Sequence, residues 1–167
     1  MGGQEESVFA QENETILHAS PLKVWSALTR FEDYGLWSPF IRIAGPLELG
    51  AIVQYSFRMN ANKPRFFNID ARITALELHR HIAYRFSLGW LISMEETYSV
   101  ALDPVGSRVI HSFRCTGPLS ALNISKMNRN LKQILETTDR LFQRHLRPVR
   151  TSGLPKKRAR KGFRPNA

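Results

Sequence analysis

Cysteine is nearly missing from this sequence: Cys115 is the only one among 167 residues, so an internal disulfide bond is excluded. This composition suits a reducing compartment. Long apolar runs are missing as well. Stretches such as Phe86–Met94 fall far short of the ~20 residues that a membrane-spanning helix requires. The N-terminus, MGGQEESVF, lacks the basic and then apolar pattern of a signal peptide. We therefore expect a cytoplasmic protein without a transmembrane segment.

The sequence motifs of metal and cofactor sites are also missing. It contains no phosphate-binding loop, no zinc-ligand spacing and no dinucleotide fingerprint. His79 and His81 share one face of a predicted strand, but no third ligand follows nearby, and a pair of surface histidines explains them better. Cys115 fits a small core residue better than a nucleophile. We expect neither a metal nor a cofactor.

The positive charge is concentrated at the C-terminal end. The chain has 24 Lys and Arg against 14 Asp and Glu, and residues 147–167 contain eight of the basic residues and none of the acidic ones. We interpret residues 1–6 as an N-terminal tail, 7–146 as one domain and 147–167 as a basic, disordered tail. The basic tail could bind nucleic acid or an anionic membrane through its charge, or it could be a solvated extension.

Most of the domain alternates apolar and polar side chains with a period of two, which is typical of strands with one covered face. Short connections between these segments favour an antiparallel meander. The predicted strands are residues 7–19, Ile41–Ala44, Gly50–Met59, Phe66–Glu77, His81–Phe86, Glu95–Leu102 and Arg108–Thr116.

Three helices are predicted between and after these strands. Ser20 and Pro21 form a helix start, because Ser20 can cap free N–H groups and Pro21 needs no partner there. A second short helix covers Phe31–Trp37 and stops before Pro39. From Leu119 to Leu146 the apolar residues recur every three or four positions, which predicts a helix of about 40 Å. A helix of that length can cover a curved sheet from end to end.

This order of elements resembles the helix-grip fold of the SRPBCC superfamily, which includes START-type lipid-transfer domains, birch-pollen-allergen-like proteins and polyketide cyclases. The resemblance rests on Ala19-Ser20-Pro21, Val24-Trp25, Trp37-Ser38-Pro39 and the glycine-bounded stretch Gly45–Gly50. It implies an α+β fold, with an antiparallel sheet of six to seven strands curved around the long C-terminal helix. Members of this superfamily bind lipids, sterols, hormones or polyketides, and some are enzymes. No shared catalytic set matches this sequence.

A strongly curved sheet cannot press its whole inner face against one straight helix. The gap between them is either a ligand pocket or a core filled by large side chains, and apolar walls with a few polar groups are typical of pockets. We expect a ligand to pass between the long helix and the loops at Gly45–Gly50 and Gly89–Leu91. The candidate ligand-binding residues are Tyr55, Phe57, Met59, Phe67, Ile69, Tyr84, Phe86, Tyr98, His111, Phe113, Met127, Leu131 and Ile134.

Glu96, His111 and Tyr98 are the candidate catalytic residues. The alternation places them on the inner face, where a buried carboxylate needs a partner, and Glu96 can meet His111 diagonally across two neighbouring strands. Such a pair could act as a general acid and base. Alternatively, Glu96 lies at the open rim in water and His111 bonds a tyrosine or the backbone.

These patterns leave three functional hypotheses. The first is the binding or transfer of a small hydrophobic ligand, such as a lipid, a polyketide or another aromatic or isoprenoid compound, without catalysis. The second is a cyclase or dehydratase that uses Glu96, His111 and a tyrosine in the same cavity. The third is an interaction scaffold that docks through its basic tail.

Overall fold

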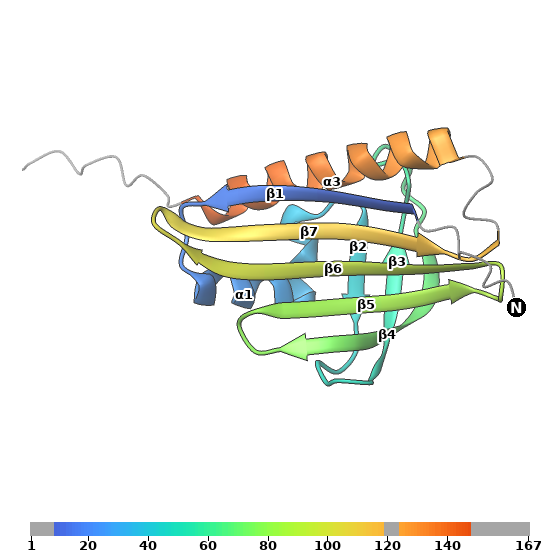
Figure 1. Cartoon of the computed structure of the whole chain (residues 1–167), viewed down its shortest axis with the longest axis horizontal. Coiled ribbons are helices and arrows are strands. Elements are labelled where there is room, and N and C mark those ends of the chain that lie inside the picture. Colours follow the sequence, from blue (N-terminus) through green and yellow to red (C-terminus); the bar gives the residue numbers. More distant parts are fainter. Residues whose placement is uncertain (1–8, 119–123, 148–167) are drawn as a thin grey trace, which may run out of the picture.

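The computed structural model describes residues 9–118 and 124–147, except for the side chains of Ile124, Ser125 and Met127. Figure 1 shows seven strands and two helical segments followed by one long helix. The strands are β1 Phe9–Leu17, β2 Ile41–Ala44, β3 Ile52–Phe57, β4 Phe67–Glu77, β5 His81–Leu88, β6 Ile92–Asp103 and β7 Gly106–Thr116. The helices are α1 Pro21–Thr29, a 3₁₀ turn at Phe31–Asp33 that runs into α2 Tyr34–Trp37, and α3 Ile124–Leu146.

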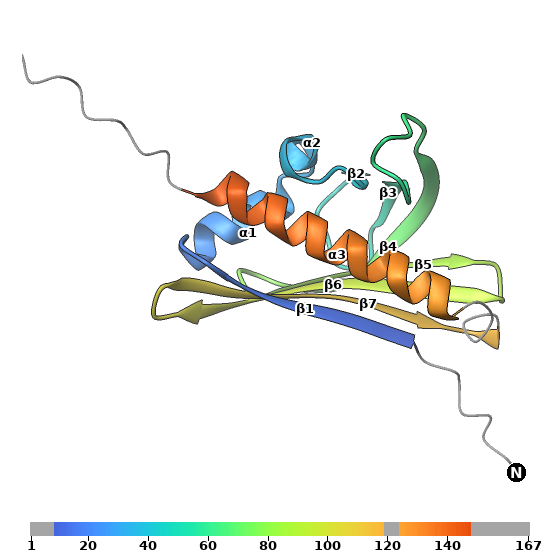
Figure 2. The same cartoon turned by 90° about the horizontal axis from the view of Figure 1, so that it is seen from above.

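All seven strands form one antiparallel sheet in the order β1-β7-β6-β5-β4-β3-β2. The predicted meander is therefore correct, and the long connection from β1 to β2 carries the short helices. A bulge in β4 between Ile73 and Ala75 shifts the register against β5. Bulges bend a strand and increase its twist. Beyond it β3 and β4 curl away from the plane of the other strands, as Figure 2 shows.

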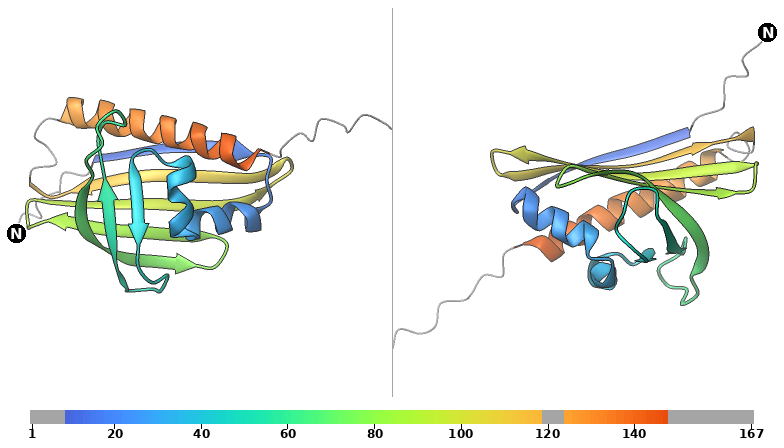
Figure 3. Two further views of the ribbon diagram at one scale, coloured as in Figure 1. Left: turned by 180° about the vertical axis from the view of Figure 1, so that it is seen from behind. Right: turned by 90° about the horizontal axis from the view of Figure 1, so that it is seen from below.

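The helices all lie on the concave face of this sheet, which Figure 3 shows from behind and from below. The predicted cap is present, because the Ser20 hydroxyl accepts a hydrogen bond from the backbone N–H of Lys23 and Pro21 begins α1. At the end of α2 the Ser38 hydroxyl accepts from the N–H of Ile41, which turns the chain into β2. The helix-grip fold expected from the sequence is confirmed.

The core lies between the concave face and the helices. Alternate residues of β7 are buried as expected, namely Val109, His111, Phe113 and Cys115, and α1 contributes Val24, Trp25 and Leu28. From α3 the buried apolar residues are Leu131, Ile134, Leu135, Phe142 and Leu146. Among the described helices, none is both long enough and apolar enough to cross a lipid bilayer.

Candidate functional site

The long helix follows only one side of the sheet. In Figures 1 and 2, α3 runs beside β1, while β3 and β4 lie further away. Polar side chains hold it there: Gln11 of β1 donates to Asn128, and Gln143 of α3 donates to the carbonyl of Ile16. A straight helix held at one edge of a curled sheet leaves space at the opposite edge. That space contains the candidate site.

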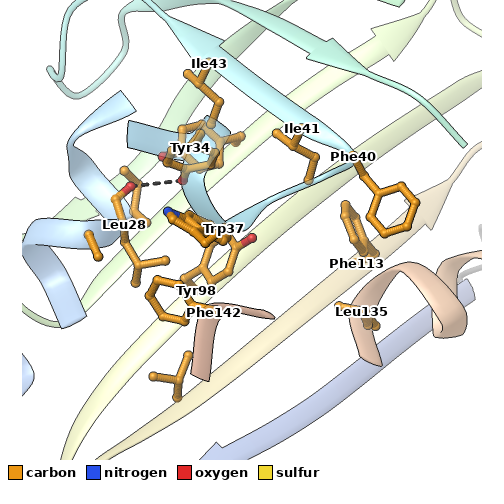
Figure 4. Close-up of a cluster of buried hydrophobic side chains, with 14 of the residues drawn as sticks. Leu28, Tyr34, Trp37, Phe40, Ile41, Ile43, Tyr98, Phe113, Leu135 and Phe142 are labelled. Atoms are coloured by element: carbon orange, nitrogen blue, oxygen red, sulfur yellow. Dashed lines mark hydrogen bonds between the residues drawn. The ribbon is translucent and has the colours of Figure 1, made fainter. Parts of the chain in front are cut away.

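The inner part of this space is an apolar cavity of about 150 Å³. Figure 4 shows three of the lining side chains, Phe40, Ile41 and Phe113, among other buried side chains of the core. Its walls come from β2, β3, β5, β6, β7, α3 and the segments that flank β2 and β3, and the aromatic rings of Tyr55 and Phe86 stack at 4.9 Å between centroids. The complete lining is Phe40, Ile41, Tyr55, Phe57, Arg58, Met59, Phe86, Leu88, Ile92, Met94, Phe113, Leu131 and Ile134.

A larger groove of about 940 Å³ lies outside the cavity. It runs between the segment from Arg58 to Phe67, which connects β3 to β4, and the first half of α3. Phe40, Arg58, Met59 and Ile134 line both spaces, so the groove and the cavity adjoin. Leu88 and Ile92 flank the expected access loop at Gly89–Leu91, but no residue of Gly45–Gly50 lines the cavity or the groove.

The structure divides the predicted ligand-binding residues into three groups. Those that line the cavity are Tyr55, Phe57, Met59, Phe86, Phe113, Leu131 and Ile134. Phe67 lies in the outer groove with 58% of its surface exposed, and Met59, at 44%, lies where the two spaces meet. Tyr84, Tyr98 and His111 are buried in the interior and the half-buried Ile69 packs against the core, and none of these four residues lines either space. The Met127 side chain is outside the described part of the chain.

The predicted pair of Glu96 and His111 forms directly. Tyr98 lies opposite His111 in the register, and Glu96 lies opposite Phe113, so the contact is the expected diagonal one. His111 Nε2 lies 2.9 Å from Glu96 Oε1, and both side chains are fully buried. Glu96 is therefore not at a wet rim.

Two tyrosines complete the surroundings of this carboxylate. The Tyr98 hydroxyl donates to Glu96 Oε1 at 3.0 Å, and the Tyr55 hydroxyl donates to Oε2 at 2.6 Å. The Tyr98 ring also stacks on the His111 imidazole with 4.0 Å between centroids. Only Tyr55 belongs both to this polar cluster and to the cavity wall.

The other imidazole nitrogen reaches a residue that the sequence analysis missed. His111 Nδ1 lies 2.8 Å from Asp139 Oδ1 on α3, and Asn13 of β1 donates to Asp139 Oδ2 at 2.6 Å. A signal was present, because Asp139 follows Leu135 by four positions and precedes Phe142 by three, on the apolar stripe of the helix. An acidic residue at such a position calls for a buried partner.

The electrostatics of the cluster follow from its burial and its two carboxylates. Burial alone would lower the pKa of His111, but Asp139 and then Glu96 outweigh it and raise this pKa to about 9. The imidazole is therefore a cation at neutral pH and donates to both carboxylates. Burial and the charge of Glu96 raise the pKa of Tyr55 and Tyr98 well above 10, so both phenols remain donors.

Within residues 9–118 and 124–147, no group of three or more His, Cys, Asp or Glu side chains is arranged so that it could hold a metal ion. The basic tail, which the sequence left open as either a contact for an anionic partner or a solvated extension, lies outside these residues from position 148 onward.

Comparisons with known proteins agree with this architecture. A family model described as "Polyketide cyclase / dehydrase and lipid transport" matches residues 10–144. No curated protein matches the chain. Among solved structures, Ara h 8.0201 superposes with a TM-score of 0.64 at 15% identity, covering 84% of this chain and 98% of its own.

Two further structures extend the comparison. The major latex-like protein 151 of Panax ginseng gives a TM-score of 0.65 at 13% identity, with 84% of this chain and 99% of its own covered. DynU16, from the dynemicin biosynthetic locus, gives 0.62 at 16% identity and covers 82% of this chain and 46% of its own. Identities this low establish a shared fold only.

Proposed function

Because the chain belongs to the polyketide cyclase/dehydrase and lipid transport family, we propose that it binds a small hydrophobic ligand between its sheet and α3. Family membership supports hydrophobic ligand binding in general terms. Our proposal is more specific: the ligand places an apolar ring or chain end in the inner cavity, and the rest of it lies in the outer groove.

The apolar cavity beside an open groove is the observation that supports this proposal. A cavity of about 150 Å³, lined by aliphatic and aromatic side chains together with Arg58, is large enough to hold a molecule the size of benzene. The adjoining groove adds space on the scale of ligand pockets, which commonly measure about 300–1,000 Å³. Tyr55 is the one cavity-lining phenol, and its hydroxyl already donates to Glu96, so apolar contacts dominate the inner end.

The proposal is tested by titration with N-phenyl-1-naphthylamine, an uncharged probe that fluoresces in apolar surroundings. We expect saturable binding to the wild-type protein. Leu131→Phe adds a ring inside the cavity, and we expect it to weaken binding by about tenfold or more, equivalent to about 1.4 kcal/mol. Leu22→Phe is the matched control, because Leu22 is an exposed leucine on α1.

The probe affinities of the wild type and the two variants can be compared once circular dichroism shows that both variants are folded. Equal affinity of the wild type and Leu131→Phe would place the probe elsewhere on the protein and contradict the proposal. An absence of saturable binding to the wild type would contradict it as well.

Catalysis in the same cavity is the second candidate function, favoured by the position of Tyr55. Its hydroxyl connects the cavity wall to the Glu96–His111–Asp139 cluster, so it could exchange a proton with a bound carbonyl compound. It ranks second because the Glu96 carboxylate already accepts from Tyr55, Tyr98 and His111 and does not line the cavity. A buried carboxylate satisfied in this way fits a structural role.

The two candidate functions predict different results when the wild type and Tyr55→Phe are each incubated with a compound that co-purifies with the protein. The binding hypothesis predicts that the compound is recovered unchanged and binds the variant within a few-fold of the wild type. Conversion of the compound by the wild type, lost in Tyr55→Phe while binding persists, would establish the enzyme instead.

A further inference from the structure

Arg58 stands where three spaces meet. It lines the inner cavity, the outer groove, and a third hollow beside Trp37, Arg42 and Arg144. Its side chain is held in place, since Nε donates to the carbonyl of Pro39 at 2.6 Å and Nη1 donates to the carbonyl of Lys63 at 2.7 Å. Its guanidinium also lies over the ring of Phe66, 4.6 Å from the centroid. An arginine fixed in this way is already positioned to meet a ligand at the cavity mouth.

The charged residues that line the groove around Arg58 are all basic. Lys63, Arg65 and Lys126 line it together with Arg58, and no Asp or Glu does. Within the described part of the chain, none of these four side chains forms a salt bridge with a carboxylate, although Arg30, Arg85 and Arg108 each do so elsewhere on the surface. A concave site lined by charges of one sign attracts ions of the opposite sign.

A second arginine adds to this local excess of charge. The guanidinium of Arg42 also lies over the Phe66 ring, 5.2 Å from its centroid, and donates to the carbonyls of Ser38 and Ile41. Burial, and then the nearby charge of Arg58, lower the pKa of Arg42. The two cations therefore repel one another, and an anion placed between them and the groove would relieve that repulsion.

We propose that the ligand of this cavity is a small amphiphilic anion, whose apolar part enters the cavity while its carboxylate, sulfonate or phosphate group pairs with Arg58 in the basic groove. This inference rests on the proposed function, because it requires an apolar body inside the cavity. It adds the chemical class of the ligand: an apolar compound that carries an anionic group at one end. Lys63, Arg65 and Lys126 strengthen the attraction from the groove walls.

A matched pair of probes tests this inference. 8-Anilino-1-naphthalenesulfonate and N-phenyl-1-naphthylamine share one aromatic body and differ in the sulfonate. We expect the wild type to bind the sulfonate about tenfold more tightly. Arg58→Gln should remove this preference, because it weakens the binding of the sulfonate more than the binding of the uncharged probe.

Arg58 also supports the chain connecting β3 to β4, so a second variant guards against misfolding. Arg65→Gln combined with Lys126→Gln removes two groove charges whose side chains form no hydrogen bond or ion pair within the described residues. We expect this double variant to reduce the preference for the sulfonate about threefold or more. Arg114→Gln is the control for the single charge that Arg58→Gln removes, because Arg114 is exposed on the convex face of the sheet, and we expect it to leave the binding of both probes unchanged.

The outcomes separate the two proposals. Equal affinities of the wild type for both probes, or equal losses of both in the groove variants, would overturn the anion inference while the hydrophobic-ligand proposal stands. Failure of the uncharged probe to bind the wild type would overturn the proposed function itself. The inference is supported if both groove variants lose more affinity for the sulfonate than for the uncharged probe and Arg114→Gln loses none.

Discussion

Glu96 is a carboxylate without solvent access, and three donors surround it. Tyr55, Tyr98 and His111 replace the water that the charge loses on burial. Removing one member of a buried ion pair costs about 3–5 kcal/mol, because the remaining charge is left uncompensated. The contribution of this cluster to the free energy of unfolding therefore depends on the positive charge of His111, which both Glu96 and Asp139 stabilise.

The protonation of His111 leads to a pH-dependent stability. Its pKa rises from the usual 6.5 to about 9 on folding, so the imidazolium stabilises the fold fully below pH 6.5 and progressively less as the pH rises through 9. We expect the free energy of unfolding to fall by about 3 kcal/mol across this range, since a tenfold change in proton affinity is worth about 1.4 kcal/mol. Urea unfolding from pH 6 to pH 10 measures it.

Two variants and one spectroscopic measurement check the cause. Asp139→Asn should lower the NMR titration midpoint of the His111 ring towards 6.5, whereas His18→Gln, at an exposed histidine, should leave the stability profile unchanged. A wild-type midpoint for His111 at or below 6.5 would contradict this account, because the imidazole would then be neutral between its carboxylates.

At the level of single residues, the sequence offered the Glu96–His111 contact as one of two alternatives, and the full extent of the cluster was not predicted. Period-two alternation and the position of the Asp103–Gly106 turn were sufficient for the diagonal pair. Asp139 and Asn13 were not predicted, because they come from a helix and an edge strand that meet only in the folded chain. Sequence spacing gives the face of an element, not which other element packs against that face.

The position of α3 against β1 determines where the cavity lies. Polar contacts connect the two elements: Gln11 to Asn128, Asn13 to Asp139 and Gln143 to the Ile16 carbonyl. Towards β3 and β4 the helix faces the groove instead. The alternation of the sequence predicted the ends of the strands to within a few residues. The placement of the helix beside β1 was not predicted, because it depends on contacts between residues far apart in the sequence.

Asn13→Ala tests the attachment of the helix to β1. It removes the donor to Asp139 Oδ2, and we expect a loss of about 1–2 kcal/mol in the free energy of unfolding, because a buried charged acceptor loses a partner. Hydrogen exchange should also become faster along α3. Asn68→Ala is the matched control, at an exposed asparagine of β4 whose side chain forms no hydrogen bond within the described residues. Equal stability of both variants would show that this contact does not fix the helix.

On the scale of the whole molecule, the fold was predictable from the sequence, whereas the charge of the groove was not. The sheet wraps around three helices, and the order of its elements alone led to the correct fold class. The basic groove was less visible, because residues 1–146 contain almost equal numbers of acidic and basic residues. Folding brings Arg58, Lys63, Arg65 and Lys126 together and leaves the acidic residues outside the groove lining. The small net charge of residues 1–146 therefore concealed a local excess of positive charge in the groove.

The central claim is that the space between the sheet and α3 holds a small apolar ligand. Native mass spectrometry of wild type and Leu131→Phe, each purified from a cellular lysate and then incubated with excess N-phenyl-1-naphthylamine, tests it most directly. We expect one bound small molecule per wild-type chain, which is either a co-purified compound or the probe. We expect no bound small molecule in Leu131→Phe. Unbound protein in both samples, or the same bound mass in both, would contradict it.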